Sequence, residues 1–185
     1  MWFVLFGLRR GSFWVVLVIA SLAMLGIAAA RAPRHQDLLM VHQGLVVLGL
    51  LTATASFLAF LALAPIVRHV GPLATGVRRV DGAVHTAPGV LAFLLVVLVA
   101  VSEEVFWRGY VQGRLAEDVG PERAFRLTAV TYAAAHLLTF NLALIVAALA
   151  CGSLWGWLRL RTGSVVPAVL SHCVFVCLMV SLYPV

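Results

Sequence analysis

Glu103 and Glu104 stand side by side at the end of an apolar run, and Arg108 follows them closely. Residues four apart on a helix share one face, so Glu104 and Arg108 are predicted to form an ion pair. Neighbouring residues are about 100° apart around a helix, so Glu103 is expected to point in a different direction. The spacing therefore predicts one glutamate held by the arginine and one glutamate directed into a cavity.

Two histidines lie in other apolar segments, His136 after a row of alanines and His172 in the last apolar run. Charged and ionisable side chains are costly in hydrocarbon, so we expect the carboxylates and imidazoles to converge and satisfy one another. A carboxylate near an imidazole can take a proton from water and return it to a leaving amine. A second histidine can stabilise the developing oxyanion. The expected chemistry is peptide hydrolysis inside a membrane.

The composition indicates the elements that must position these side chains. Of the 185 residues, 63% are hydrophobic and 11% are charged. A soluble surface needs far more charge, whereas a membrane helix needs about 20 apolar residues in succession. We therefore predict an all-α fold, a polytopic membrane bundle of about six transmembrane helices. It is expected to be a single integral-membrane domain over residues 1–185, with a catalytic core at about 89–182.

The predicted spans alternate with polar segments. Their approximate bounds are residues 12–30, 41–67, 89–107, 127–140, 141–158 and 165–182. Pro33 is predicted to stop the first helix, and residues 68–88 are predicted to form a loop. An amphipathic stretch at 108–126, with a turn at Gly120-Pro121, is expected to join the third span to the fourth.

The basic residues bear on location and partners. All thirteen are Arg, which together with the abundance of Ala, Val, Leu and Gly is typical of a GC-rich bacterial genome. Basic residues that flank apolar runs are the usual pattern of membrane topology, and no aromatic-interleaved basic patch indicates nucleic-acid binding. We expect a multi-pass protein of the bacterial inner membrane. Its expected partners are the lipid bilayer and a membrane-anchored or hydrophobic peptide, with no nucleic acid.

The polar residues also form recognisable motifs. Glu103-Glu104-x-x-x-Arg108 resembles the EExxxR motif of the CAAX-protease and bacteriocin-processing family. The members of that family are glutamic-type intramembrane proteases, related to the type II CAAX prenyl endopeptidases. Tyr132-x-x-x-His136 resembles the family's second motif, FxxxH, with Tyr in place of Phe.

The resemblance implies a role for each matching residue. Glu103 would activate water together with His136. Glu104 and Arg108 would brace the site, and His172 would face the developing oxyanion. No cofactor or metal is implied by this set of catalytic residues.

The third motif is only partly matched. His172 resembles the start of HxxxN or HxxxD, but Val176 stands where the motif has Asn or Asp. An amide at that position can help to hold the oxyanion, so another donor is expected to replace it. Asn141 and Ser171 are the candidates.

Alternatives to a glutamic-type protease remain. A glutamate and two histidines are a legitimate zinc ligand set, although no HExxH pair is present and Cys173 and Cys177 point partly away. The change at Val176 also fits a non-enzymatic relative with an immunity or scaffold role. A channel or transporter is less favoured, because no broken-helix pair recurs in matching halves. If the chain is a bacterial protease, maturation or C-terminal sorting of exported proteins is the expected task.

Overall fold

The all-α prediction is confirmed. The computed structural model describes residues 10–31, 38–84 and 86–182, and these residues form helices and no strand. Their order is α2 (Arg10–Arg31), α3 (Gln43–His69), α4 (Gly71–Val84), α5 (Gly89–Glu104), the π-helical η1 (Val105–Val111), α6 (Gln112–Val119), α7 (Pro121–His136), the 3-10 turn η2 (Leu137–Thr139), α8 (Leu142–Thr162) and α9 (Val166–Leu182).

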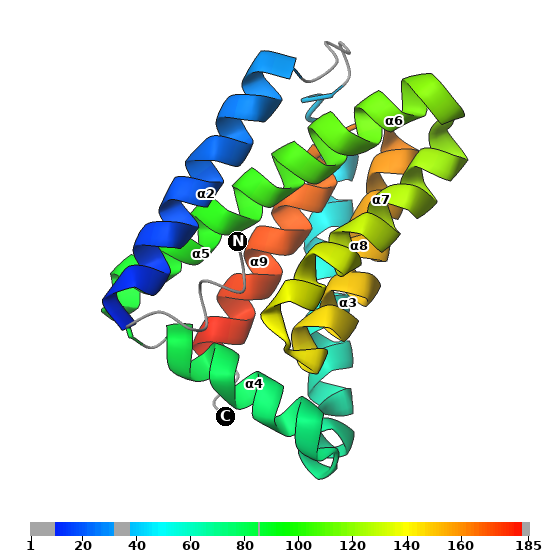
Figure 1. Ribbon diagram of the computed structural model, residues 1–185. Helices are drawn as coiled ribbons and strands as arrows, with labels where there is room; N and C mark the ends of the chain where they lie inside the picture. Colours follow the sequence, from blue (N-terminus) through cyan, green and yellow to red (C-terminus); the bar gives the residue numbers. More distant parts are fainter. Residues whose placement is uncertain (1–9, 32–37, 85, 183–185) are drawn as a thin grey trace.

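The chain is an integral membrane protein. Within the described residues, four helical segments are long and apolar enough to cross a bilayer: α2, α3, α8 and the continuous stretch Gly89–Val119. The apolar helix α9 is shorter than these four. Together with α7, these segments run alternately up and down in the bundle, so about six spans remains a fair description (Figure 1).

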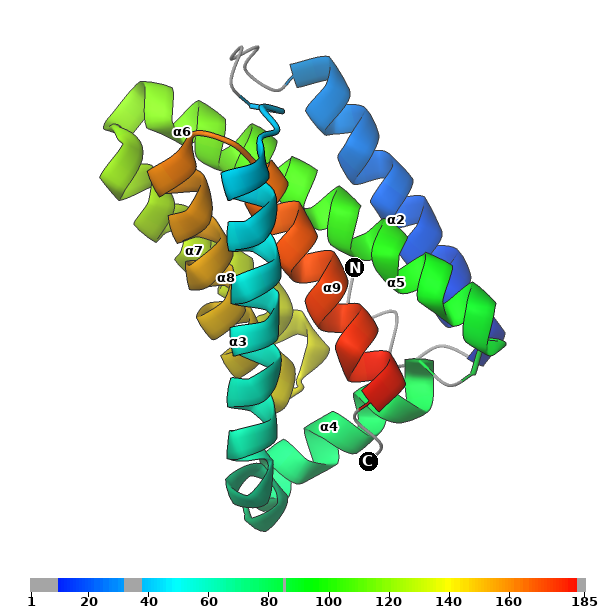
Figure 2. The same cartoon turned by 180° about the vertical axis from the view of Figure 1, so that it is seen from behind.

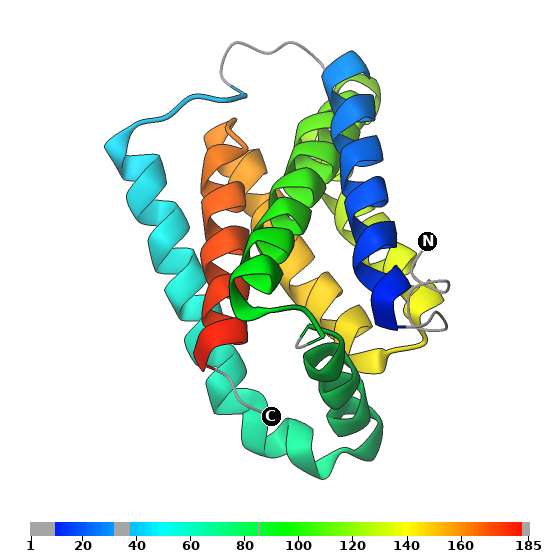
Figure 3. The ribbon, with the colours of Figure 1, turned by 90° about the vertical axis from the view of Figure 1, so that its left-hand side faces the viewer.

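The helix α9 occupies the middle of the bundle. It packs against α3 on one side and α5 on the other, and α2 covers the far side of α5 (Figure 3). The antiparallel pair α7 and α8 completes the bundle, and α8 also packs against α9 and α4 (Figure 2). The ends of α5 and α7 and the middle of α9 are therefore brought together, although they are far apart in the sequence.

Small residues allow these helices to approach closely, as is common for helix pairs in membranes. A Cβ atom added at Gly49 of α3 would lie 2.9 Å from Leu170 Cβ of α9, which leaves no room for a larger residue. Ala53, Ala100 and Ala168 are completely buried. The polar side chains of the central site are therefore buried inside a tightly packed apolar bundle.

Three sequence-based boundaries were wrong. Residues 68–88 are not a loop, because they contain the helix α4, which crosses the lower end of the bundle (Figure 1). The third span does not end near residue 107 but continues through η1 and α6 to Val119. The fourth begins at Pro121, because Gly120 adopts a φ of 83° that ends the preceding helix. Pro33, the predicted stop of the first helix, lies outside the described residues.

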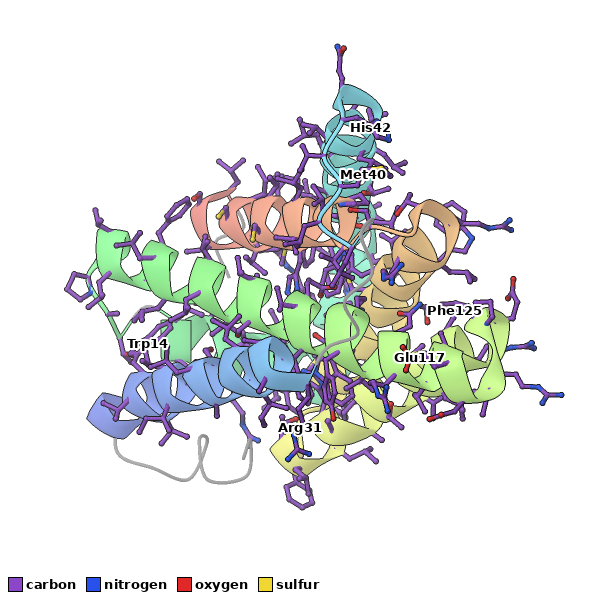
Figure 4. All side chains as sticks on the ribbon, turned by 90° about the horizontal axis from the view of Figure 1, so that it is seen from above. Trp14, Arg31, Met40, His42, Glu117 and Phe125 are labelled. Carbon is purple, nitrogen blue, oxygen red and sulfur yellow. The ribbon has the colours of Figure 1, made fainter. Side chains whose placement is uncertain are left out.

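Polar contacts tie the outer helices to the bundle. Trp14 of α2 donates a 3.0 Å hydrogen bond to Thr86 Oγ1, just before α5, and lies between these helices (Figure 4). Asn141 Nδ2 donates a 2.9 Å bond to the carbonyl oxygen of Gly76 in α4. A Cβ atom at Gly76 would overlap the Asn141 side chain, so glycine lets α4 dock at this point.

Candidate active site

The five side chains expected to do chemistry are all buried. Glu104 and Arg108 are 0% exposed, and Glu103, His136 and His172 are 5–7% exposed. They come from the end of α5, from η1, from α7 and from α9. An uncompensated charge in hydrocarbon is costly, so the contacts that compensate each group determine how the site is organised.

The predicted ion pair between Glu104 and Arg108 is present, with Arg108 Nη1 donating to Glu104 Oε1 at 3.0 Å. The η1 segment begins immediately after Glu104, and such π-helical turns are frequent at functional sites. Arg108 Nη2 also donates to the carbonyl oxygen of Gly152 in α8 at 2.9 Å. Arg108 therefore fixes Glu104 and anchors the end of α5 to α8.

His172 contacts the same carboxylate. Its Nδ1 lies 2.9 Å from Glu104 Oε1, the oxygen that also accepts from Arg108. Its ring stacks on the indole of Trp155, with centroids 3.7 Å apart and an interplanar angle of 18°. Glu104 and Trp155 together fix both the position and the plane of the imidazole.

Glu103 points to a different set of partners, as its position on the helix predicts. The hydroxyl of Tyr132 in α7 donates to Glu103 Oε2 at 2.7 Å. Tyr132 also accepts, through its backbone oxygen, a 2.8 Å hydrogen bond from His136 Nδ1. Tyr132 is therefore hydrogen-bonded to both Glu103 and His136, the two groups expected to act on water.

The packing around Tyr132 is dense. The guanidinium of Arg108 lies over its ring, with Cζ 4.5 Å from the centroid. The rings of Trp107 and His136 pack against it edge to face at centroid distances of 5.5 and 4.8 Å. A Cβ atom at Gly152 would lie 2.6 Å from Tyr132 Cδ1. The glycine at this position leaves the space that the Tyr132 ring occupies.

Neither candidate for the missing third-motif amide has contacts that favour that role. The amide of Asn141 donates to Gly76 in α4, and its carbonyl oxygen caps α8 by accepting from the amide of Leu144. Ser171 Oγ accepts a 3.2 Å hydrogen bond from Trp155 Nε1. Val176 packs against the apolar cluster that contains Tyr132 and Trp155. Asn141 and Ser171 thus support the helices around the site.

Sequence reasoning did not identify several residues that build this site. In the sequence Tyr132 stands out only as a variant of a motif residue, while Trp155, Gly152 and Gln112 match no motif. Gln112 continues the spacing of Glu104 and Arg108 by four residues, and its Nε2 donates to the carbonyl oxygen of Gly156 at 3.0 Å. That regular spacing of polar residues was the available signal.

Two further observations bear on ligands. Within the part of the chain that the structure describes, no three His, Cys, Asp or Glu side chains lie close enough together to hold a metal ion. An apolar groove lies between the N-terminal part of α5 and the C-terminal half of α9, and none of the five expected site residues lines it. Its lining residues are Phe93, Cys173, Val174, Cys177, Leu178, Ser181 and Leu182.

Comparison with known proteins gives a family. The family model described as type II CAAX prenyl endopeptidase Rce1-like matches residues 85–178, about half of the chain. This range contains all five expected site residues. Neither the curated proteins nor the solved structures include a match to this chain. By that match, the chain belongs to the type II CAAX prenyl endopeptidase Rce1-like family, a family of intramembrane proteases.

Proposed function

We propose that this protein is a glutamic-type intramembrane endopeptidase that cleaves membrane-anchored or hydrophobic peptides with water activated by Glu103 and His136. The observation that carries the proposal is the convergence of two buried carboxylate and imidazole sets from three helices. One set is Glu103 and His136, joined through Tyr132. The other is Glu104 and His172, joined directly and held by Arg108. The family membership supports the same reaction class.

The first step would be attack of water on the scissile carbonyl. Tyr132 engages Glu103 Oε2, so Oε1 is the carboxylate oxygen that takes a proton from water. The water oxygen then bonds to the carbonyl carbon, and the carbonyl electron pair moves to its oxygen. A carboxylate that is held within hydrogen-bonding distance of a water molecule can act as its general base.

The second set would stabilise the charge that develops on that oxygen. The Nδ1 of His172 is directed at the Glu104 carboxylate, which can only accept, so Nε2 would donate to the oxyanion when both ring nitrogens carry hydrogen and His172 acts as the imidazolium. When the intermediate collapses, the carbon–nitrogen bond breaks and the proton on Glu103 passes to the leaving amine. Glu104 and Arg108 act in this scheme by holding His172, because neither side chain is exposed to solvent.

The location of the site supports the proposed substrate class. The site is buried among membrane helices, and the groove between α5 and α9 is apolar, which suits a hydrophobic peptide segment. The arginine-only basic content supports a bacterial inner-membrane location, where maturation or C-terminal sorting of exported proteins is the proposed task.

The decisive experiment is the substitution Glu103→Gln in purified protein in detergent or liposomes, assayed on a peptide with an apolar anchor. The amide keeps the shape of the side chain but loses its basicity. We expect cleavage to fall by at least about 100-fold, the usual contribution of a general base, while the thermal melting midpoint stays near that of the wild type. Cleavage at the wild-type rate would overturn the proposed mechanism. Absence of cleavage by the wild-type protein, with an intact fold, would favour the immunity or scaffold role.

A further inference from the structure

Resting on the proposed function, we infer that Tyr132 is the positioning residue that aligns both water-activating groups, Glu103 through its hydroxyl and His136 through its backbone carbonyl. One residue thereby fixes the relative placement of a base on α5 and an imidazole on α7. The family's second motif has Phe at this position, so the hydroxyl is a feature of this chain.

The hydroxyl contact sets the orientation of the Glu103 carboxylate. The O–O distance of 2.7 Å is that of a strong hydrogen bond, and Tyr132 and Glu103 are only 3% and 5% exposed. The carboxylate of Glu103 is at the end of a long side chain, which would otherwise sample several rotamers. The bond to Oε2 restricts this freedom and presents Oε1 to the water.

The carbonyl contact sets the orientation of His136. A carbonyl oxygen can only accept, so the 2.8 Å contact requires that His136 Nδ1 carries the hydrogen. In the neutral imidazole the hydrogen is then on Nδ1 and not on Nε2. This contact spans one helical turn of α7, so it ties the imidazole of His136 to the backbone of Tyr132.

The Tyr132 ring itself is held firmly enough to act as this reference point. Arg108 covers one face of the ring, Trp107 packs against it, and Gly152 approaches its edge. Catalytic groups must be held within about 0.5 Å of a productive geometry by neighbours whose own rotamers are locked. These three neighbours supply that restraint.

The test is a steady-state comparison of Tyr132→Phe with the wild-type enzyme. Phenylalanine keeps the ring packing and the backbone carbonyl and removes only the hydroxyl. We expect kcat to fall by about 10-fold or more, the usual effect of losing a hydrogen bond to a charged group, with KM within about twofold of the wild-type value. Both kcat and KM are measured well below the melting temperature. A variant that only loses stability would then not show a lower kcat with an unchanged KM.

The matched control is Tyr110→Phe. The Tyr110 ring packs against Phe106, not against the carboxylates, so its hydroxyl is expected to be dispensable and kcat to be unchanged. A wild-type kcat in Tyr132→Phe, measured alongside an inactive Glu103→Gln, would overturn the inference while leaving the proposed function standing. Equal losses of kcat in the two phenylalanine variants would also overturn it.

A thermal-melting cycle tests the contact without any substrate. The four proteins are the wild type, Tyr132→Phe, Glu103→Ala and the double variant. If the hydroxyl and the carboxylate are coupled, the melting shifts of the single variants will not add in the double variant. Additive melting shifts would overturn the coupling between Tyr132 and Glu103 even if no substrate were cleaved. Failure of this inference can therefore be distinguished from failure of the proposed function.

Discussion

Glu104 and His172 lie 68 residues apart in the chain, and a 2.9 Å contact between Glu104 Oε1 and His172 Nδ1 joins them. The same carboxylate oxygen accepts from Arg108 Nη1 at 3.0 Å. Glu103, the adjacent residue, accepts a 2.7 Å hydrogen bond from the hydroxyl of Tyr132 on α7. Two neighbouring glutamates therefore belong to two different hydrogen-bonded sets, and their substitutions should have different consequences.

Glu104→Gln should reduce both stability and activity. The substitution removes the negative charge beside the fully buried Arg108, and breaking a buried ion pair typically costs about 3–5 kcal/mol. His172 would lose a charged partner as well. Thermal melting in detergent should show a clearly lower midpoint for this variant than for Glu103→Gln, the matched control. Equal midpoints would contradict the division between the two glutamates.

His172→Ala should lower the rate of cleavage by about 100-fold or more, the usual cost of losing one oxyanion donor. The exposed His69 at the end of α3, whose ring contacts a carbonyl of its own helix, offers a control. His69→Ala is expected to leave kcat unchanged. Cleavage by His172→Ala at more than about a tenth of the wild-type rate would argue that His172 does not face the oxyanion.

Val176→Asn restores the residue that the third motif would have, and we expect it to change kcat by less than about threefold. The position packs against the apolar cluster around Trp155 and Tyr132, where a new amide would have to be buried. A rate increase of about tenfold, or the 1.4 kcal/mol that this represents, would show that the oxyanion site of the natural chain is incomplete. Steady-state kinetics on the same anchored peptide decides between these results.

Cleavage should not depend on a bound metal ion. The mechanism assigns proton transfer to Glu103 and oxyanion stabilisation to His172, so no step requires a Lewis acid. Prolonged dialysis against a strong chelator should leave kcat unchanged, and added zinc should not increase it. Stoichiometric zinc in the purified protein, with activity that is lost on chelation and restored only by metal, would favour the zinc-dependent alternative.

Gly152→Ala should impair the site from a position that contacts no substrate. The added methyl group would lie 2.6 Å from Tyr132 and 3.3 Å from Arg108 Nη2, so at least one of them must move. We expect kcat to fall by about tenfold and the protein to be destabilised by about 1–3 kcal/mol, as in other overpacked cores. Gly26→Ala on α2 is the control, because a methyl group there meets nothing within 4 Å. That variant should melt at or above the wild-type temperature.

Much of the architecture could be predicted from local patterns. Apolar runs about 20 residues long determine helices in a bilayer, because backbone groups in hydrocarbon must be satisfied within the segment. The helix α4 was missed because it is amphipathic and polar for its length, which resembles a loop in a membrane sequence. The continuation of α5 to Val119 was missed because charged residues suggest a helix end, whereas Arg108 is buried inside the protein.

The membrane bundle follows from the apolar runs, and the ion pair between Glu104 and Arg108 and the separate direction of Glu103 follow from helical periodicity within one segment. The contact between Glu104 and His172, and the places of Tyr132, Trp155 and Gly152 around the site, follow instead from the packing of the helices. These contacts join residues on different helices, and their geometry depends on how closely α7, α8 and α9 pack. The spacing of residues along the chain does not encode the distances between these helices, because small residues on several helices together set how closely the helices pack.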